Sequence, residues 1–93
     1  MVKVEVHPRI NERHPEIFVK DVRDAWENCL SSGCRKRSAF DDYVLVGTDA
    51  RGRLLEMVAV QKGNGHWLVY HAMTPPSKRV LKELGLTGEG RLR

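Results

Sequence analysis

The stretch from residue 66 to residue 79 carries a proton-transfer group and two cations close together. His71 lies near the end of an apolar, aromatic-rich run, and a Pro-Pro turn separates this run from Lys78 and Arg79. Histidine takes up and releases protons near neutral pH, and lysine and arginine bind phosphate groups. The sequence therefore places acid–base chemistry beside phosphate binding within one short segment.

Cations gather at more than one place in this chain, whose net charge is +4. Arg35, Lys36 and Arg37 form a continuous triplet, and Lys78 and Arg79 open a predicted helix. Acidic residues are nearly absent beside these clusters, a pattern typical of proteins that bind a polyanion. We expect these five residues to bind the phosphate groups of a polyanion; the alternative is that they are solvated surface charge.

Length and composition fit one small globular domain. The 93 residues are 41% hydrophobic and 30% charged, which is typical of folded soluble proteins rather than disordered ones. No apolar run approaches the ~20 residues needed to cross a bilayer, and the first residues alternate charge with valine rather than forming a signal peptide. We therefore expect a cytoplasmic protein with no membrane contact, with a single domain over residues 1–86 and a flexible basic tail over residues 87–93.

Cysteine and histidine usage predicts neither a disulfide nor a metal site. The two cysteines, Cys29 and Cys34, are expected to be free thiols, as is usual inside cells. The four histidines are scattered, whereas metal ligands recur at tight spacing. We expect no metal and no cofactor.

The clearest structural pattern is a helix over residues 19–31. Apolar residues recur there at positions i, i+3, i+4 and i+7, which predicts an amphipathic helix that buries Val22, Trp26 and Cys29. Gly33 is the expected stop signal.

Apolar runs joined by short glycine-bearing turns predict an antiparallel sheet. The expected strands span residues 43–47, 54–61 and 66–73. A short strand or extended arm is expected at residues 2–6, and shorter helices at residues 9–14 and 76–84. The order α-α-β-β-β-α, with helices segregated from a small antiparallel sheet, is that of an α+β domain.

This layout, over residues 8–84, resembles the BrnT-type toxins of the RelE/ParE superfamily. The first predicted helix ends in Arg13-His14, which matches the basic residue and histidine of that family, and Pro15 stands where the family commonly has glycine. The family's last strand ends in a small polar residue, an alanine and an arginine. The matching residues here are His71-Ala72-Met73, so the arginine is missing.

The resemblance implies a RelE-like fold and the toxin half of a bacterial toxin–antitoxin pair. Such a toxin is a metal-independent endoribonuclease that inhibits translation and is silenced by a cognate antitoxin. A base deprotonates the ribose 2′-hydroxyl, cations stabilise the phosphate, and an acid protonates the leaving 5′-oxygen. His71, His14 and Arg13 are the implied catalytic residues. The implied partners are free or ribosome-bound RNA and the antitoxin, in a homodimer or a toxin–antitoxin complex.

Each candidate residue also has a purely structural explanation. Strand alternation places His71 on the same apolar face as Trp67, Val69 and Met73, as a hydrogen-bonded core residue. His14 would cap helix carbonyls, and Arg13 would pair with a neighbouring glutamate. Tyr70, expected on the opposite face from His71, either stacks on an RNA base or completes the core. Glu56 should point away from the core, as a surface residue or a carboxylate on the RNA face.

Two other function classes remain open at this stage. The domain could be a nucleic-acid-binding module that uses the same cations without cleaving RNA. It could also be a protein-interaction subunit whose basic surface meets an acidic partner. An adjacent reading frame for a DNA-binding antitoxin would favour the toxin.

Overall fold

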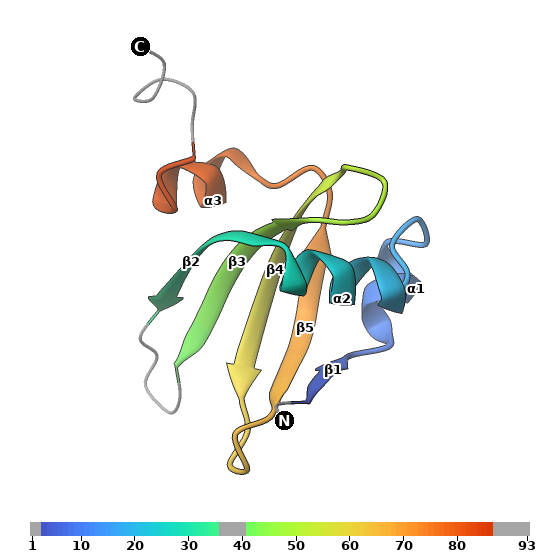
Figure 1. The fold of residues 1–93 in the computed structure, drawn as a ribbon, viewed down its shortest axis with the longest axis vertical. Coiled ribbons are helices and arrows are strands. Elements are labelled where there is room, and N and C mark those ends of the chain that lie inside the picture. Colours follow the sequence, from blue (N-terminus) through green and yellow to red (C-terminus); the bar gives the residue numbers. More distant parts are fainter. Residues whose placement is uncertain (1–2, 36–40, 87–93) are drawn as a thin grey trace.

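The computed structural model describes residues 3–35 and 41–86, which form one sheet flanked by helices (Figure 1). The elements are β1 (Val4–Val6), α1 (Arg9–Arg13), α2 (Val19–Glu27), β2 (Cys29–Arg35), β3 (Asp42–Thr48), β4 (Leu54–Gln61), β5 (Trp67–Met73) and α3 (Lys78–Glu83). The predicted tail, residues 87–93, lies outside the described residues. No helix in the described ranges is long and apolar enough to cross a membrane.

The strands lie in the order β1-β5-β4-β3-β2. β2, β3, β4 and β5 pair antiparallel, and β1 pairs parallel with β5. The α+β class and the antiparallel order of β3, β4 and β5 are therefore confirmed. The sheet is mixed rather than purely antiparallel, because the N-terminal segment joins it as a parallel edge strand.

The predicted helix over residues 19–31 is too long at its C-terminal end. α2 ends at Glu27, and Asn28 has non-helical dihedral angles. The next residues form β2, which pairs with β3, and Cys29 is exposed rather than buried. Serine and glycine in this segment are weak helix formers, and pairing with the edge of β3 satisfies their backbone groups instead.

α2 crosses the strands and packs closely on β3 (Figure 1). Val22 and Ala25 are fully buried beneath it, and the Trp26 ring lies 5.4 Å from that of Trp67. Gly47 of β3 allows this approach, because a Cβ atom there would overlap the Ala25 carbonyl oxygen.

Replacing Gly47 with alanine is therefore expected to destabilise the fold by about 1–2 kcal/mol, since the helix must move away from the sheet. Denaturant unfolding monitored by tryptophan fluorescence measures this loss. Gly63→Ala is the control, because a Cβ atom at Gly63 has no neighbour within 4 Å. Equal stabilities of the two variants would contradict the close-packing argument.

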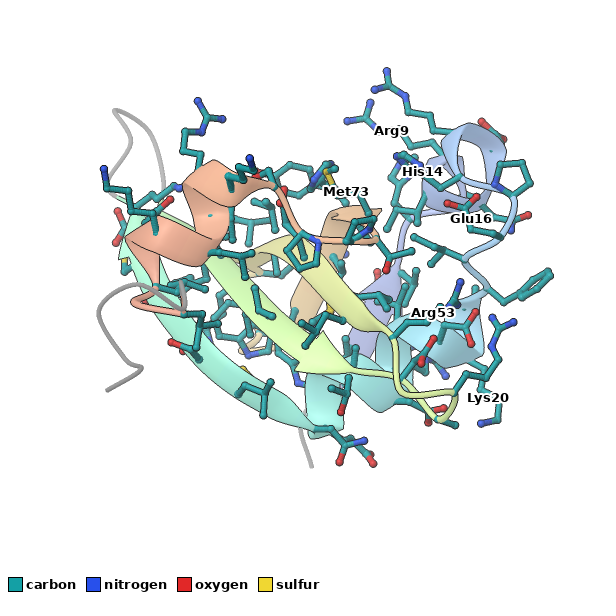
Figure 2. All side chains as sticks on the ribbon, turned by 90° about the horizontal axis from the view of Figure 1, so that it is seen from above. Arg9, His14, Glu16, Lys20, Arg53 and Met73 are labelled. Atoms are coloured by element: carbon teal, nitrogen blue, oxygen red, sulfur yellow. The ribbon has the colours of Figure 1, made fainter. Side chains whose placement is uncertain are left out.

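Each face of the sheet has its own core (Figure 2). The larger core lies under α1 and α2 and consists of Ile10, Ile17, Val22, Ala25, Leu45, Leu55, Met57, Ala59, Val69 and Ala72. The smaller core lies under α3 and consists of Val44, Val46, Val58 and Val80. The sheet is thus covered on both faces, and residues that face away from the larger core are not automatically exposed.

The β3–β4 turn is fixed to the start of α2 by a network of charges. The Asp49 side chain is fully buried; it accepts hydrogen bonds from the Arg51 and Arg53 amides, both at 2.9 Å, and from Arg53 Nε at 2.7 Å. The guanidinium groups of Arg51 and Arg53 also lie 3.2 Å from Asp21 at the start of α2. These contacts tie a sheet turn to a helix N-terminus.

Candidate active site

A β-bulge in β5 determines on which face of the sheet the side chains at the end of this strand lie. Val58 of β4 pairs with His71, but the next residue, Ala59, pairs with Val69, so Tyr70 is an extra residue on β5. A bulge of this kind sets two residues of one strand against one of the other. Tyr70 packs on the smaller core. The predictions that His71 shares a face with Val69, and that Tyr70 faces the opposite way, are wrong because the inserted residue changes the alternation.

His71 contacts a buried carboxylate on the α3 face of the sheet. Its Nε2 atom lies 2.8 Å from Oε2 of Glu56, and Oε1 of Glu56 accepts hydrogen bonds from the Ser77 amide and hydroxyl, each at 2.9 Å. Ser77 is the N-cap of α3, and its hydroxyl oxygen also accepts a hydrogen bond from the Val80 amide. Glu56 does point away from the larger core, but at 6% exposure it is not the expected surface residue.

The Glu56 carboxylate is held in its charged form. Burial alone would raise the pKa of Glu56, but hydrogen bonds from the Ser77 amide, from His71 and from the Ser77 hydroxyl outweigh burial. The pKa of this carboxyl group is therefore below its usual range, and Glu56 is ionised at neutral pH. His71 thus has an anion on one side.

On its other side His71 lines a pocket of about 70 Å³ between α1 and β5. The lining residues are Arg9, Ile10, Arg13, His14, Tyr70, His71 and Ala72. The structure therefore brings together the three predicted catalytic residues, from segments about 57 residues apart, and it adds Arg9. Tyr70, predicted to contact RNA, forms part of the same wall.

The pairing of β1 with β5 places α1 at this position. β1 pairs with the first half of β5, and the His7 amide donates to the Val69 carbonyl, so the chain turns into α1 beside the second half of β5. Ile10 is buried and anchors the helix to the larger core. The side-chain amide of Asn11 then donates hydrogen bonds to the Pro15 and Ile17 carbonyls, which fixes the segment that follows His14.

Arg9 was not predicted as a site residue. It lies one helical turn before Arg13, and this i, i+4 spacing is the signal that could have indicated a shared face. In the described part of the chain neither arginine forms an ion pair, and the Nδ1 atom of His14 lies 3.8 Å from Glu16. Figure 2 shows Arg9 on α1, and His14 directly after α1, at one end of the molecule. The described residues of the pocket wall include cations and no carboxylate, which suits an anionic ligand.

The other predicted phosphate-binding residues lie elsewhere or outside the described ranges. Lys78 and Arg79 are exposed on α3 and do not line the pocket. Arg35 forms a two-point ion pair with Glu83, at 2.7 and 2.9 Å, on a strand roughly 14 Å from β5. Lys36 and Arg37 lie outside the described residues.

Two further features concern ligand chemistry. Met73, at the position where the resemblance calls for arginine, is partly buried at the end of β5 and does not line the pocket. Among residues 3–35 and 41–86, no three histidine, cysteine, aspartate or glutamate side chains are grouped as a metal site would require.

A scan against protein-family models, a search of curated proteins and a search of solved structures each found no match.

Proposed function

We propose that this protein is an endoribonuclease that cleaves RNA by attack of the ribose 2′-hydroxyl on the adjacent phosphate. The observation that supports this most is the pocket in which His14 and His71 lie with Arg9 and Arg13. Two histidines can act as base and acid near neutral pH. Two arginines without ion-pair partners among the described residues can bind a phosphate and stabilise the charge that develops on it.

The proposed reaction needs only these side chains. One histidine takes the proton of the 2′-hydroxyl, and the 2′-oxygen forms a bond to phosphorus. The bond from phosphorus to the 5′-oxygen breaks, and the other histidine protonates this leaving oxygen. The products are a 2′,3′-cyclic phosphate and a 5′-hydroxyl. Tyr70 in the pocket wall offers an aromatic ring to a neighbouring base.

The resemblance to BrnT-type toxins supports a biological role for this activity. In that role the protein inhibits translation in a bacterial cell, and an antitoxin blocks the pocket or the exposed α3 cations. Met73 removes the arginine expected at the end of β5. Arg9 supplies a guanidinium group to the pocket from α1 instead, whereas Met73 itself lies outside the pocket.

The direct test incubates the purified protein with a short single-stranded RNA in the presence of EDTA. Fragments ending in a 2′,3′-cyclic phosphate, with 5′-hydroxyl partners, are the expected result. Intact RNA that is nevertheless bound in a salt-sensitive way would instead indicate a non-catalytic nucleic-acid-binding module. Growth inhibition on induced expression, relieved by the product of the neighbouring gene, tests the toxin role separately.

Neutralising the two pocket arginines together, Arg9→Gln with Arg13→Gln, is expected to weaken RNA binding and flatten its salt dependence. Each phosphate contact on a single strand contributes about 0.7 to the slope of log K against log salt, so two lost contacts lower the slope by about 1.4. Fluorescence anisotropy over a salt series measures this. The control neutralises Lys3 and Arg23, which line a separate hollow beside Trp26. Equal effects of the two double variants would show that net charge alone governs binding.

A further inference from the structure

Glu56 is a buried carboxylate that the proposed cleavage reaction does not itself require. It is 6% exposed, and it lies on β4 behind His71, outside the set of residues that line the pocket. A buried charge is costly unless it is paired and hydrogen-bonded. Its contacts to His71 and Ser77 satisfy this need, so they determine how both partners are oriented.

The contact between Glu56 and His71 determines the histidine tautomer. An ionised carboxylate only accepts hydrogen bonds. The Nε2 atom of His71, 2.8 Å from Oε2 of Glu56, must therefore carry a proton. In the neutral ring the lone pair is then on Nδ1.

The carboxylate cannot easily turn away from His71, because Ser77 holds its other oxygen. The Ser77 amide and hydroxyl both donate to Oε1 at 2.9 Å, and the same hydroxyl caps α3. Glu56 is therefore fixed by the start of a helix, and the His71 ring is fixed by Glu56. The His71 side chain remains 37% exposed, so the ring is accessible from the pocket.

We propose that Glu56 is a positioning residue that makes His71 the base of the cleavage reaction, acting through Nδ1, and leaves His14 as the acid. This inference rests on the proposed endoribonuclease function. Nδ1 of His71 takes the 2′-hydroxyl proton as the bond from the 2′-oxygen to phosphorus forms. The resulting imidazolium carries its charge beside the Glu56 carboxylate. His14 gives its proton to the 5′-oxygen as the bond from that oxygen to phosphorus breaks.

A first experiment reads the tautomer without reference to activity. Nitrogen-15 NMR of the protein, recorded at a pH at which the His71 ring is neutral, should show His71 protonated at Nε2 and unprotonated at Nδ1. In Glu56→Gln the side chain keeps its shape but loses its charge, and a mixture of tautomers is expected. An Nδ1-protonated ring in the wild-type protein, or an unchanged spectrum in the variant, would overturn the positioning role.

A second experiment measures rates. Glu56→Gln should lower kcat for RNA cleavage by about 10- to 100-fold, part of what a positioned base contributes, and leave KM within about twofold. Glu83→Gln is the matched control, because Glu83 also connects α3 to the sheet through its ion pair with Arg35. A purely structural role for Glu56 predicts similar kcat values for the two variants at matched stability.

A third experiment separates base from acid with uridine 3′-(4-nitrophenyl) phosphate, whose leaving group needs no proton. For His71→Ala, the cleavage rate relative to wild type should be as low on this substrate as it is on RNA. For His14→Ala, the cleavage rate on this substrate should return close to that of the wild type. Rescue of His71→Ala would reverse the assignment. An inactive wild-type protein with the expected tautomer would overturn the endoribonuclease proposal, whereas an active one with no response to Glu56→Gln would overturn only the inference.

Discussion

Replacing His71 with alanine or glutamine is expected to slow RNA cleavage by about 10²- to 10⁴-fold, which is what a positioned proton-transfer group contributes. The imidazole contacts the buried Glu56 on one side and the cationic pocket on the other, and neither replacement offers a titratable nitrogen there. Glutamine keeps an amide that can donate to Glu56, so its thermal unfolding should stay near that of the wild type. Single-turnover cleavage of a labelled RNA measures the rate, and growth on induced expression tests the consequence in cells.

The control for this prediction is a histidine at the other end of β5. His66→Gln changes the same residue type in the turn before the strand, outside the pocket. Its cleavage rate should equal that of the wild type. If His71→Gln folded normally and cleaved RNA at the wild-type rate, His71 would be only a partner of Glu56, and the pocket would need another base.

Local sequence patterns predicted most of the helices and strands. The errors occur where pairing with a distant strand determines the secondary structure. β4 was predicted with the correct boundaries, because its apolar run and flanking glycine turns are local signals. The first residues of β2, 29–31, were predicted as helix because the apolar residues Cys29 and Leu30 continue the α2 stripe, and only pairing with β3 makes this segment a strand. In the same way, β1 is too short to be recognised with certainty without its partner, β5.

The candidate site was predictable in part for similar reasons. The resemblance to BrnT-type toxins implied that Arg13, His14 and His71 form one site, and these three residues do line one pocket. Glu56 was not connected with His71, because the bulge at Tyr70 moves His71 to the α3 face and no glycine marks that bulge in the sequence. A contact between strands that depends on one inserted residue cannot be found from periodicity alone.

Asp49→Asn is expected to destabilise the protein by about 3 kcal/mol, because it removes one partner of a buried ion pair. The Asp49 side chain is fully buried and accepts from Arg53 Nε at 2.7 Å, while Arg53 is 25% exposed. An asparagine keeps one acceptor for the turn amides but turns a donor towards the guanidinium group. Urea unfolding at neutral pH measures the loss. Asp24→Asn, which breaks the exposed ion pair with Lys20, is the control and should lower the free energy of unfolding much less.

The loss of stability caused by Asp49→Asn should become smaller as the pH falls. Burial raises the pKa of Asp49, but hydrogen bonds from Arg53 and Arg51 outweigh it and bring the pKa below the ordinary value of 3.8. Because the folded-state pKa is lower than the unfolded one, the charge stabilises the fold fully above the unfolded value, and this stabilisation disappears as the pH falls through the folded value. The difference in free energy of unfolding between the wild type and Asp49→Asn should thus be constant near neutral pH and become smaller below about pH 4. A difference that grew on acidification would show that the Asp49 charge opposes folding and that the buried pair with Arg53 is not what holds the β3–β4 turn on α2.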